Sequence, residues 1–111
     1  MVMLRSEKIT DFSAVKLAAY DGDKPVGRIY LYLLKNDLHK QPFGFLEDLF
    51  VEEPYRKQGI GSQLVRQAIA EAKNRGCYKL IANSRTFAGA IHKFYEKQGF
   101  AKWGFEFRMN L

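Results

Sequence analysis

The chain has 111 residues, of which 47% are hydrophobic and 14% aromatic, and its formal net charge is +6. This length and composition predict one folded domain with a hydrophobic core, and they exclude a globally disordered chain. The charge favours an anionic partner, and a nucleic acid, a membrane surface and a polyphosphate cofactor all fit it. Because the basic residues are scattered rather than grouped, the pattern argues against a dedicated nucleic-acid surface.

Cysteine content and apolar runs set the expected compartment. Cys77 is the single cysteine, so no intrachain disulfide is expected, and the sequence favours a reducing, cytoplasmic location. Residues Met1–Thr10 lack the apolar stretch of a signal peptide. The longest apolar run, Ile29–Leu34, is too short to span a bilayer, so no membrane partner is expected.

The first half of the chain shows strand patterns. The apolar segment Val2–Leu4 is predicted to form a short first strand. Apolar residues alternate loosely along Ala14–Tyr20, which is strand spacing. The dense turn signal Asp21–Pro25 follows, and Val26–Leu34 is rich in β-branched and aromatic residues, so an antiparallel hairpin is predicted. After a polar loop, Gly44–Val51 is the next predicted strand.

The second half of the chain alternates helices and strands. An amphipathic helix is predicted to end at Gly76, and Tyr78–Asn83 follows it as a short strand, so the chain contains a β-α-β crossover with parallel strands. A second helix is predicted at Ala88–Gln98 and a last strand, interrupted near Gly104, at Phe100–Leu111. The apolar face of the first helix consists of Leu64, Val65, Ala68, Ile69 and Ala72.

This order of elements predicts the fold class. We expect an α/β (α+β) fold in a single domain spanning residues 1–111, in which several strands are followed by a helix, a strand, a second helix and a last strand. The sheet is expected to be mixed and mostly antiparallel, with the parallel pair at its centre.

The segment Arg56–Ser62 joins a predicted strand to a predicted helix. Its glycines lack Cβ atoms, so an anion can approach the backbone closely, and a helix N-terminus attracts negative charge. These features predict an anion site, most often one for phosphate. The segment is not a P-loop, whose Gly-Lys-Ser/Thr ending is absent, and Leu64 occupies the position where a dinucleotide-binding loop has its third glycine.

Two motifs together resemble the GCN5-related N-acetyltransferase (GNAT) superfamily. The first is Arg/Gln-x-x-Gly-x-Gly at Arg56–Gly61, after a strand that ends with Val51 and is followed by Tyr55. The second, Phe94–Phe100, looks like the family's Phe-Tyr-x-x-x-Gly-Phe signature. The stretch Glu47–Ser62 is also similar to spermidine/spermine-type amine acetyltransferases.

The resemblance implies an N-acetyltransferase that moves an acetyl group from acetyl-CoA to a primary amine by direct transfer in a ternary complex. It implies that the pyrophosphate binds the loop and that the pantetheine arm lies between Leu49–Val51 and Tyr78–Asn83. The residues expected to bind the cofactor are Leu49, Phe50, Val51, Arg56, Lys57, Gln58, Gly59, Ile60, Gly61, Ser62 and Asn83.

The resemblance also suggests catalytic residues and no metal. Tyr95 would donate a proton to the leaving sulfur, and Glu47 would contact the amine or relay its proton. The alternatives are that Tyr95 only packs beside its neighbours, that Glu47 is a solvated carboxylate, and that Glu52 or water is the base. His39 and His92 are interpreted as surface residues, and Cys77 as a core residue.

The acceptor is less defined than the cofactor. The family usually has two helices between its first two strands, and Val2–Tyr20 has no room for them, which leaves an open acceptor groove or one completed by a second subunit in a homodimer. Ala88 also stands where the family often has asparagine. A small molecule, a lysine side chain and a protein N-terminus all fit as acceptors. The alternative function is an acetyl-CoA-binding sensor or partner module without catalysis.

Overall fold

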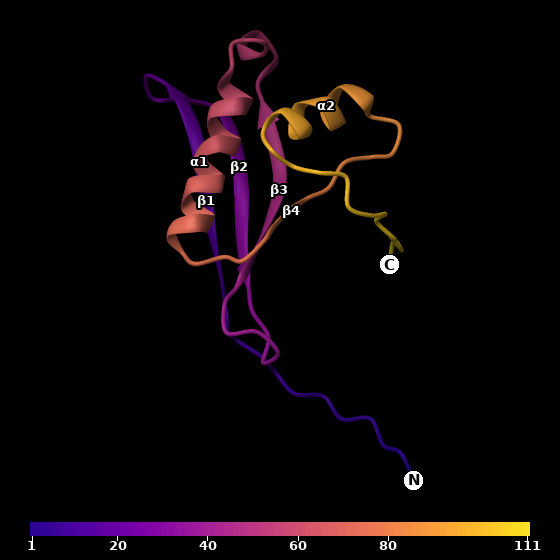
Figure 1. Cartoon of the computed structure of the whole chain (residues 1–111). Coiled ribbons are helices and arrows are strands. Elements are labelled where there is room, and N and C mark those ends of the chain that lie inside the picture. The colour runs from indigo at the N-terminus through magenta and orange to yellow at the C-terminus, as the bar shows by residue number, and fades with distance from the viewer.

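The computed structural model describes residues 1–111, which form one mixed sheet with helices on one face (Figure 1). The strands lie in the order β1-β2-β3-β4; β1, β2 and β3 are antiparallel, and β4 is parallel to β3. The predicted mixed α/β fold is therefore confirmed. The elements are β1 (Phe12–Asp21), β2 (Lys24–Leu34), β3 (Phe43–Val51), a 3₁₀ turn (Glu53–Tyr55), α1 (Ile60–Asn74), β4 (Leu80–Ala82) and α2 (Gly89–Lys97).

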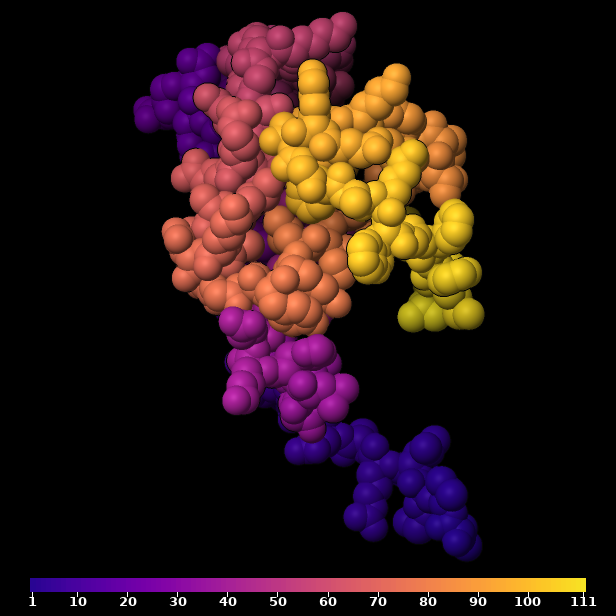
Figure 2. All heavy atoms as spheres, viewed as in Figure 1, coloured from indigo at the N-terminus to yellow at the C-terminus, as the bar shows by residue number.

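The two ends of the chain differ from the prediction. Val2–Leu4 and Phe100–Leu111 were expected as strands, and both expectations are wrong, because neither segment pairs with the sheet. Apart from Phe100, the apolar side chains of both segments are largely exposed, so they gain too little burial to hold a strand in place. Without a strand beyond β4, the parallel pair lies at the edge of the sheet and not at its centre. Figure 2 shows the first residues extending away from the body of the molecule.

The β1–β2 hairpin forms as predicted. Its turn places Gly22 at φ +59°, in the left-handed region that glycine adopts without strain. The strands pair in register from Asp21 opposite Lys24 to Phe12 opposite Leu34, with one irregularity between Ala19 and Tyr20. This hairpin gives the sheet its long antiparallel part.

Helix α1 covers one face of the sheet and builds the core. The predicted apolar face of α1 is confirmed, although Ile69 is only half-buried. Each fully buried aliphatic side chain contributes roughly 1.5–3 kcal/mol to folding. The core consists of Ile29, Leu31, Leu33 and Leu46 from the sheet and Leu64, Val65, Ala68 and Ala72 from α1.

Glycine is required where β3 passes under the helix. A Cβ at Gly44 would lie 2.7 Å from Leu80 Cδ1 and 3.1 Å from Leu31 Cδ1. Real side chains do not approach so closely, so the absent side chain is what lets β4 pack here. This contact fixes the parallel pair that borders the site.

Helix α2 is attached to the margin of the core. It has no fully buried residue, but Phe94, Tyr95 and Phe100 pack against the core cluster. The Tyr95 ring meets Phe94 and Phe100 edge to face, with centroids 5.3 and 5.4 Å away. Gln98 Nε2 donates to Ser62 Oγ at 3.2 Å, which ties the end of α2 to the start of α1. Neither helix has the length and apolar content of a membrane span.

Candidate functional site

The second half of β3 is open along one edge. β4 pairs only with Gly44–Leu46, so Glu47–Val51 pairs with β2 alone. The register with β2 also changes here, since Tyr30 opposes Glu47 whereas Arg28 opposes Phe50. β3 thus has one extra residue, a β-bulge, and Asp48 takes a φ of +55° within it. Backbone N–H and C=O groups along this edge are available to an extended ligand.

The glycine loop presents free donors beside that open edge. Lys57 and Gly59 have positive φ values of 64° and 84°, and Gly59 caps α1 without a side-chain hydrogen bond. The N–H groups of Ile60, Gly61 and Ser62 donate no backbone hydrogen bond within the chain. Together with the positive end of the helix dipole, these groups form a site suited to an anion.

Gly61 is not required by the packing of the protein. A Cβ there would meet Val51 Cγ2 at 3.9 Å and Phe94 Cζ at 4.0 Å, which are ordinary contacts. Glycine inside a helix costs roughly 0.5–1 kcal/mol relative to alanine. The fold therefore gains nothing from this glycine, whereas a ligand that approaches the first turn would.

The Arg56 side chain turns back toward β3 rather than along the loop. Its Nε donates to Val51 O at 2.7 Å, and its guanidinium lies 5.3 Å from the centre of the Phe50 ring. The guanidinium of Arg28 lies 4.9 Å from the same ring centre. Gln58 instead binds within the loop, where its Nε2 donates to Pro54 O at 3.2 Å. Two cationic groups thus converge on one aromatic ring at the open half of β3.

Tyr95 on α2 and Glu47 on β3 lie within electrostatic range of each other. Burial raises the pKa of Tyr95, and the nearby Glu47 carboxylate raises that pKa further. A tyrosine normally titrates near pH 10, so this phenol is protonated at neutral pH and can donate a proton. The carboxylate of Glu47 therefore acts electrostatically on the Tyr95 hydroxyl.

The other residues considered in the sequence have different surroundings. Asn83 Nδ2 donates to Glu106 Oε1 at 2.6 Å, so its amide is engaged by the C-terminal segment. His92 Nε2 is hydrogen-bonded to the Arg85 carbonyl at 2.7 Å, and His39 stacks on Tyr78 with centroids 4.9 Å apart. Burial raises the pKa of the half-buried Cys77 thiol, which disfavours the reactive thiolate.

Sequence reasoning missed Arg28 and the support given by Tyr55. Arg28 interrupts a strand that is otherwise mostly apolar, and that interruption was the available signal. The Tyr55 hydroxyl donates to Asp21 Oδ2 at 2.6 Å, which joins the start of the glycine loop to the β1–β2 turn. This bond fixes the loop against the hairpin.

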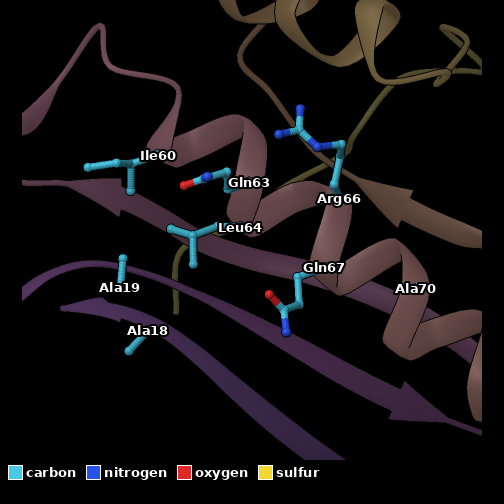
Figure 3. Close-up of a pocket in the computed structure, with 8 residues that line it drawn as sticks. All are labelled: Ala18, Ala19, Ile60, Gln63, Leu64, Arg66, Gln67 and Ala70. Atoms are coloured by element: carbon cyan, nitrogen blue, oxygen red, sulfur yellow. The ribbon is translucent and has the colours of Figure 1, made fainter.

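A groove of about 600 Å³ lies elsewhere, between β1 and α1 (Figure 3). Leu64 and Gln67 extend from α1 toward the strands, whereas Arg66 points away. Ile60 is the one predicted cofactor residue in its lining, which has no acidic or nucleophilic side chain. The groove is therefore separate from the pair formed by Tyr95 and Glu47.

Comparison with known proteins identifies the family of the chain. A model of the Acetyltransferase (GNAT) family matches residues 4–100, and the chain belongs to this family. The sequence resemblance is thus confirmed, and with it the GNAT-like fold.

Individual relatives differ in name and length. The chain is 30% identical over 95 residues to N-alpha-acetyltransferase 30 of Schizosaccharomyces pombe, covering 84% of this chain and 59% of that protein. It is 32% identical to aminoalkylphosphonate N-acetyltransferase of Salmonella typhimurium, over 86% of this chain and 62% of that protein. The crystal structure of a Trypanosoma brucei acetyltransferase superposes with a TM-score of 0.80 at 27% identity, over 88% of this chain and 69% of that structure. The chain thus spans less than two thirds of the length of these two curated relatives.

Proposed function

We propose that residues 1–111 form a single domain that transfers an acetyl group from acetyl-CoA directly to a primary amine in a ternary complex. The observation that carries this proposal is the free backbone edge of Glu47–Val51 beside the unbonded N–H groups at the start of α1. Family membership supports the same reaction class. The acceptor is an amine because the relatives described above are N-acetyltransferases.

The cofactor would bind along two adjoining surfaces. The pyrophosphate would accept hydrogen bonds from the N–H groups of Lys57–Ser62, with Lys57 adding charge. The pantetheine arm would lie against Leu49–Val51 and pair with the free backbone edge like an added strand. Asn83 would approach the arm from the opposite side after leaving Glu106.

The reaction needs a neutral amine, a stabilised oxyanion and a protonated leaving group. The amine nitrogen attacks the thioester carbonyl, and a backbone N–H of Phe50 or Val51 donates to the developing oxyanion, an interaction worth about 2.7–4 kcal/mol. The C–S bond then breaks and Tyr95 gives its proton to the sulfur. The proton lost by the amine goes to Glu47, directly or through water. Positioning of the two substrates contributes up to about 7–11 kcal/mol.

The names of the relatives suggest the classes of acceptor. The relatives include an N-alpha-acetyltransferase, an aminoalkylphosphonate N-acetyltransferase and a glucosamine 6-phosphate N-acetyltransferase of rice, which is 37% identical over 59 residues. A protein N-terminus and a small amine both fit. A lysine side chain is the third class, because it too presents a primary amine.

An acceptor screen tests the proposal. Release of free thiol from acetyl-CoA is measured with polyamines, amino sugars, aminophosphonates and peptides bearing a free N-terminus or a lysine. We expect release with at least one class, and its loss in Tyr95→Phe but not in Tyr20→Phe, whose ring is exposed on β1. Protection of the chain from heat by acetyl-CoA without thiol release from any amine would instead identify a binding module.

A further inference from the structure

The face of the sheet opposite α1 has ordered rows of polar and aromatic side chains. In one row Tyr30 stands between Lys16 on β1 and Glu47 on β3. In the next row Arg28 stands opposite Phe50. Residues two apart on a strand share a face and lie about 7 Å apart. A carboxylate and a guanidinium therefore occupy neighbouring rows on one open surface.

Arg28 has no acidic partner on this surface. The ion pairs of the chain join Lys35 to Asp11 and Arg75 to Glu71, and neither involves Arg28 or Arg56. Arg28 is half-buried over Phe50 and donates no hydrogen bond to a protein acceptor, while Arg56 uses only its Nε, on Val51 O. Two like charges are thus held within 5.3 Å of one ring centre with unused donors. An anion that contacts both groups would relieve their repulsion and accept hydrogen bonds from the unused donors.

We propose that the acceptor is a small primary amine that also carries a phosphate or phosphonate group. Its amine would approach Glu47, and its anionic group would bind Arg28 and Arg56 beside Phe50. One guanidinium group comes from a strand and the other from the glycine loop. Such a pair fits a tetrahedral dianion better than a planar carboxylate, because the dianion presents oxygens in several directions. This inference rests on the proposed function and names the substrate class of that same site.

Matched acceptors test the inference. The acetylation rates of 2-aminoethyl phosphate and 3-aminopropylphosphonate are compared with those of ethanolamine and n-propylamine, which lack the anion. We expect kcat/KM to be at least about ten-fold higher for the anionic compounds, since hydrogen bonds to charged groups are individually strong. Arg28→Gln should reduce this preference several-fold without raising KM for acetyl-CoA, and Arg28→Lys should retain part of it.

Controls separate the inference from other outcomes. Arg66→Gln removes the same charge from the far side of α1 and should keep the wild-type preference. Thermal unfolding of each variant confirms that it is folded. Equal rates for the matched acceptors, or an Arg28→Gln variant that raises KM for acetyl-CoA instead, would overturn the inference and leave the proposed function standing. Absence of thiol release with every amine would overturn both.

Discussion

The two halves of β3 serve different purposes. Residues 44–46 pair with strands on both sides, and Gly44 and Leu46 are buried beneath α1. Residues 47–51 pair on one side only, contain the bulge at Asp48 and expose Glu47. The same strand thus holds the core together and then presents a free backbone edge. The bulge at which the register changes marks the boundary between the structural half and the half that we propose to be functional.

The largest expected effect is on chemistry at the open half. Tyr95→Phe removes the proposed proton donor but keeps the ring that packs between Phe94 and Phe100. We expect the acetyl-transfer rate to fall about 10²–10⁴-fold, the usual contribution of a general acid. Single-turnover measurements with saturating cofactor isolate this step. An unchanged rate would show that Tyr95 has only a packing role.

The next effect is on stability, and it concerns the paired half. Gly44→Val places a side chain where Leu80 Cδ1 lies 2.7 Å from the ideal Cβ. We expect the free energy of unfolding to fall by about 1–3 kcal/mol, the typical cost of overpacking. Urea denaturation measures it, and Gly104→Ala is the control because nothing lies within 4 Å of its Cβ. A wild-type midpoint for Gly44→Val would contradict the close packing of β3 and β4.

A substitution at Gly61 should affect cofactor binding without harming stability. Gly61→Ala should leave the fold intact, or stabilise it by about 0.5 kcal/mol, because alanine favours a helix and meets only ordinary contacts. It should nevertheless raise the Kd for coenzyme A, since the new methyl group occupies space that the pyrophosphate needs. Calorimetric titration and thermal unfolding give the two values. An unchanged Kd would place the pyrophosphate elsewhere.

The smallest expected effect is a dependence of stability on pH. The pKa of Tyr95 is raised in the folded chain, so the folded state favours the protonated phenol. The resulting stabilisation is fully present below the ordinary tyrosine pKa of about 10 and is lost as pH rises through the folded-state pKa. Melting temperatures should therefore decline less steeply above about pH 10 in Tyr95→Phe than in the wild type. If the melting temperatures of the two proteins fell equally with pH, the burial of Tyr95 would not be coupled to its ionisation.

Local patterns predicted most of the fold. The turn at Gly22 and the alternation on either side of it specify the hairpin, and the spacing of the apolar residues from Leu64 to Ala72 specifies the buried face of α1. These features depend on neighbours within a few residues. The C-terminal segment also carries apolar residues, yet it forms no strand because strand formation depends on a partner that sequence spacing does not reveal.

The candidate site was only partly predictable for the same reason. The glycine loop and Tyr95 lie in short motifs that are recognisable along the chain. The bulge at Asp48 arises from the register between β2 and β3. Arg28 reaches Phe50 through the same strand pairing, and Arg56 reaches it by folding back onto Val51 O. Neither arrangement has a signature in either strand alone. The sequence therefore indicated the donor of the acetyl group more clearly than the acceptor.

Backbone amide shifts on titration with coenzyme A test whether the open half of β3 and the glycine loop bind the cofactor. The chain is labelled with ¹⁵N, and its amide resonances are followed by NMR as the cofactor is added. We expect the large shifts at Leu49–Val51 and Lys57–Ser62, while Phe43–Leu46 changes little. No binding at millimolar coenzyme A, or shifts concentrated in the groove between β1 and α1, would contradict cofactor binding at these two segments.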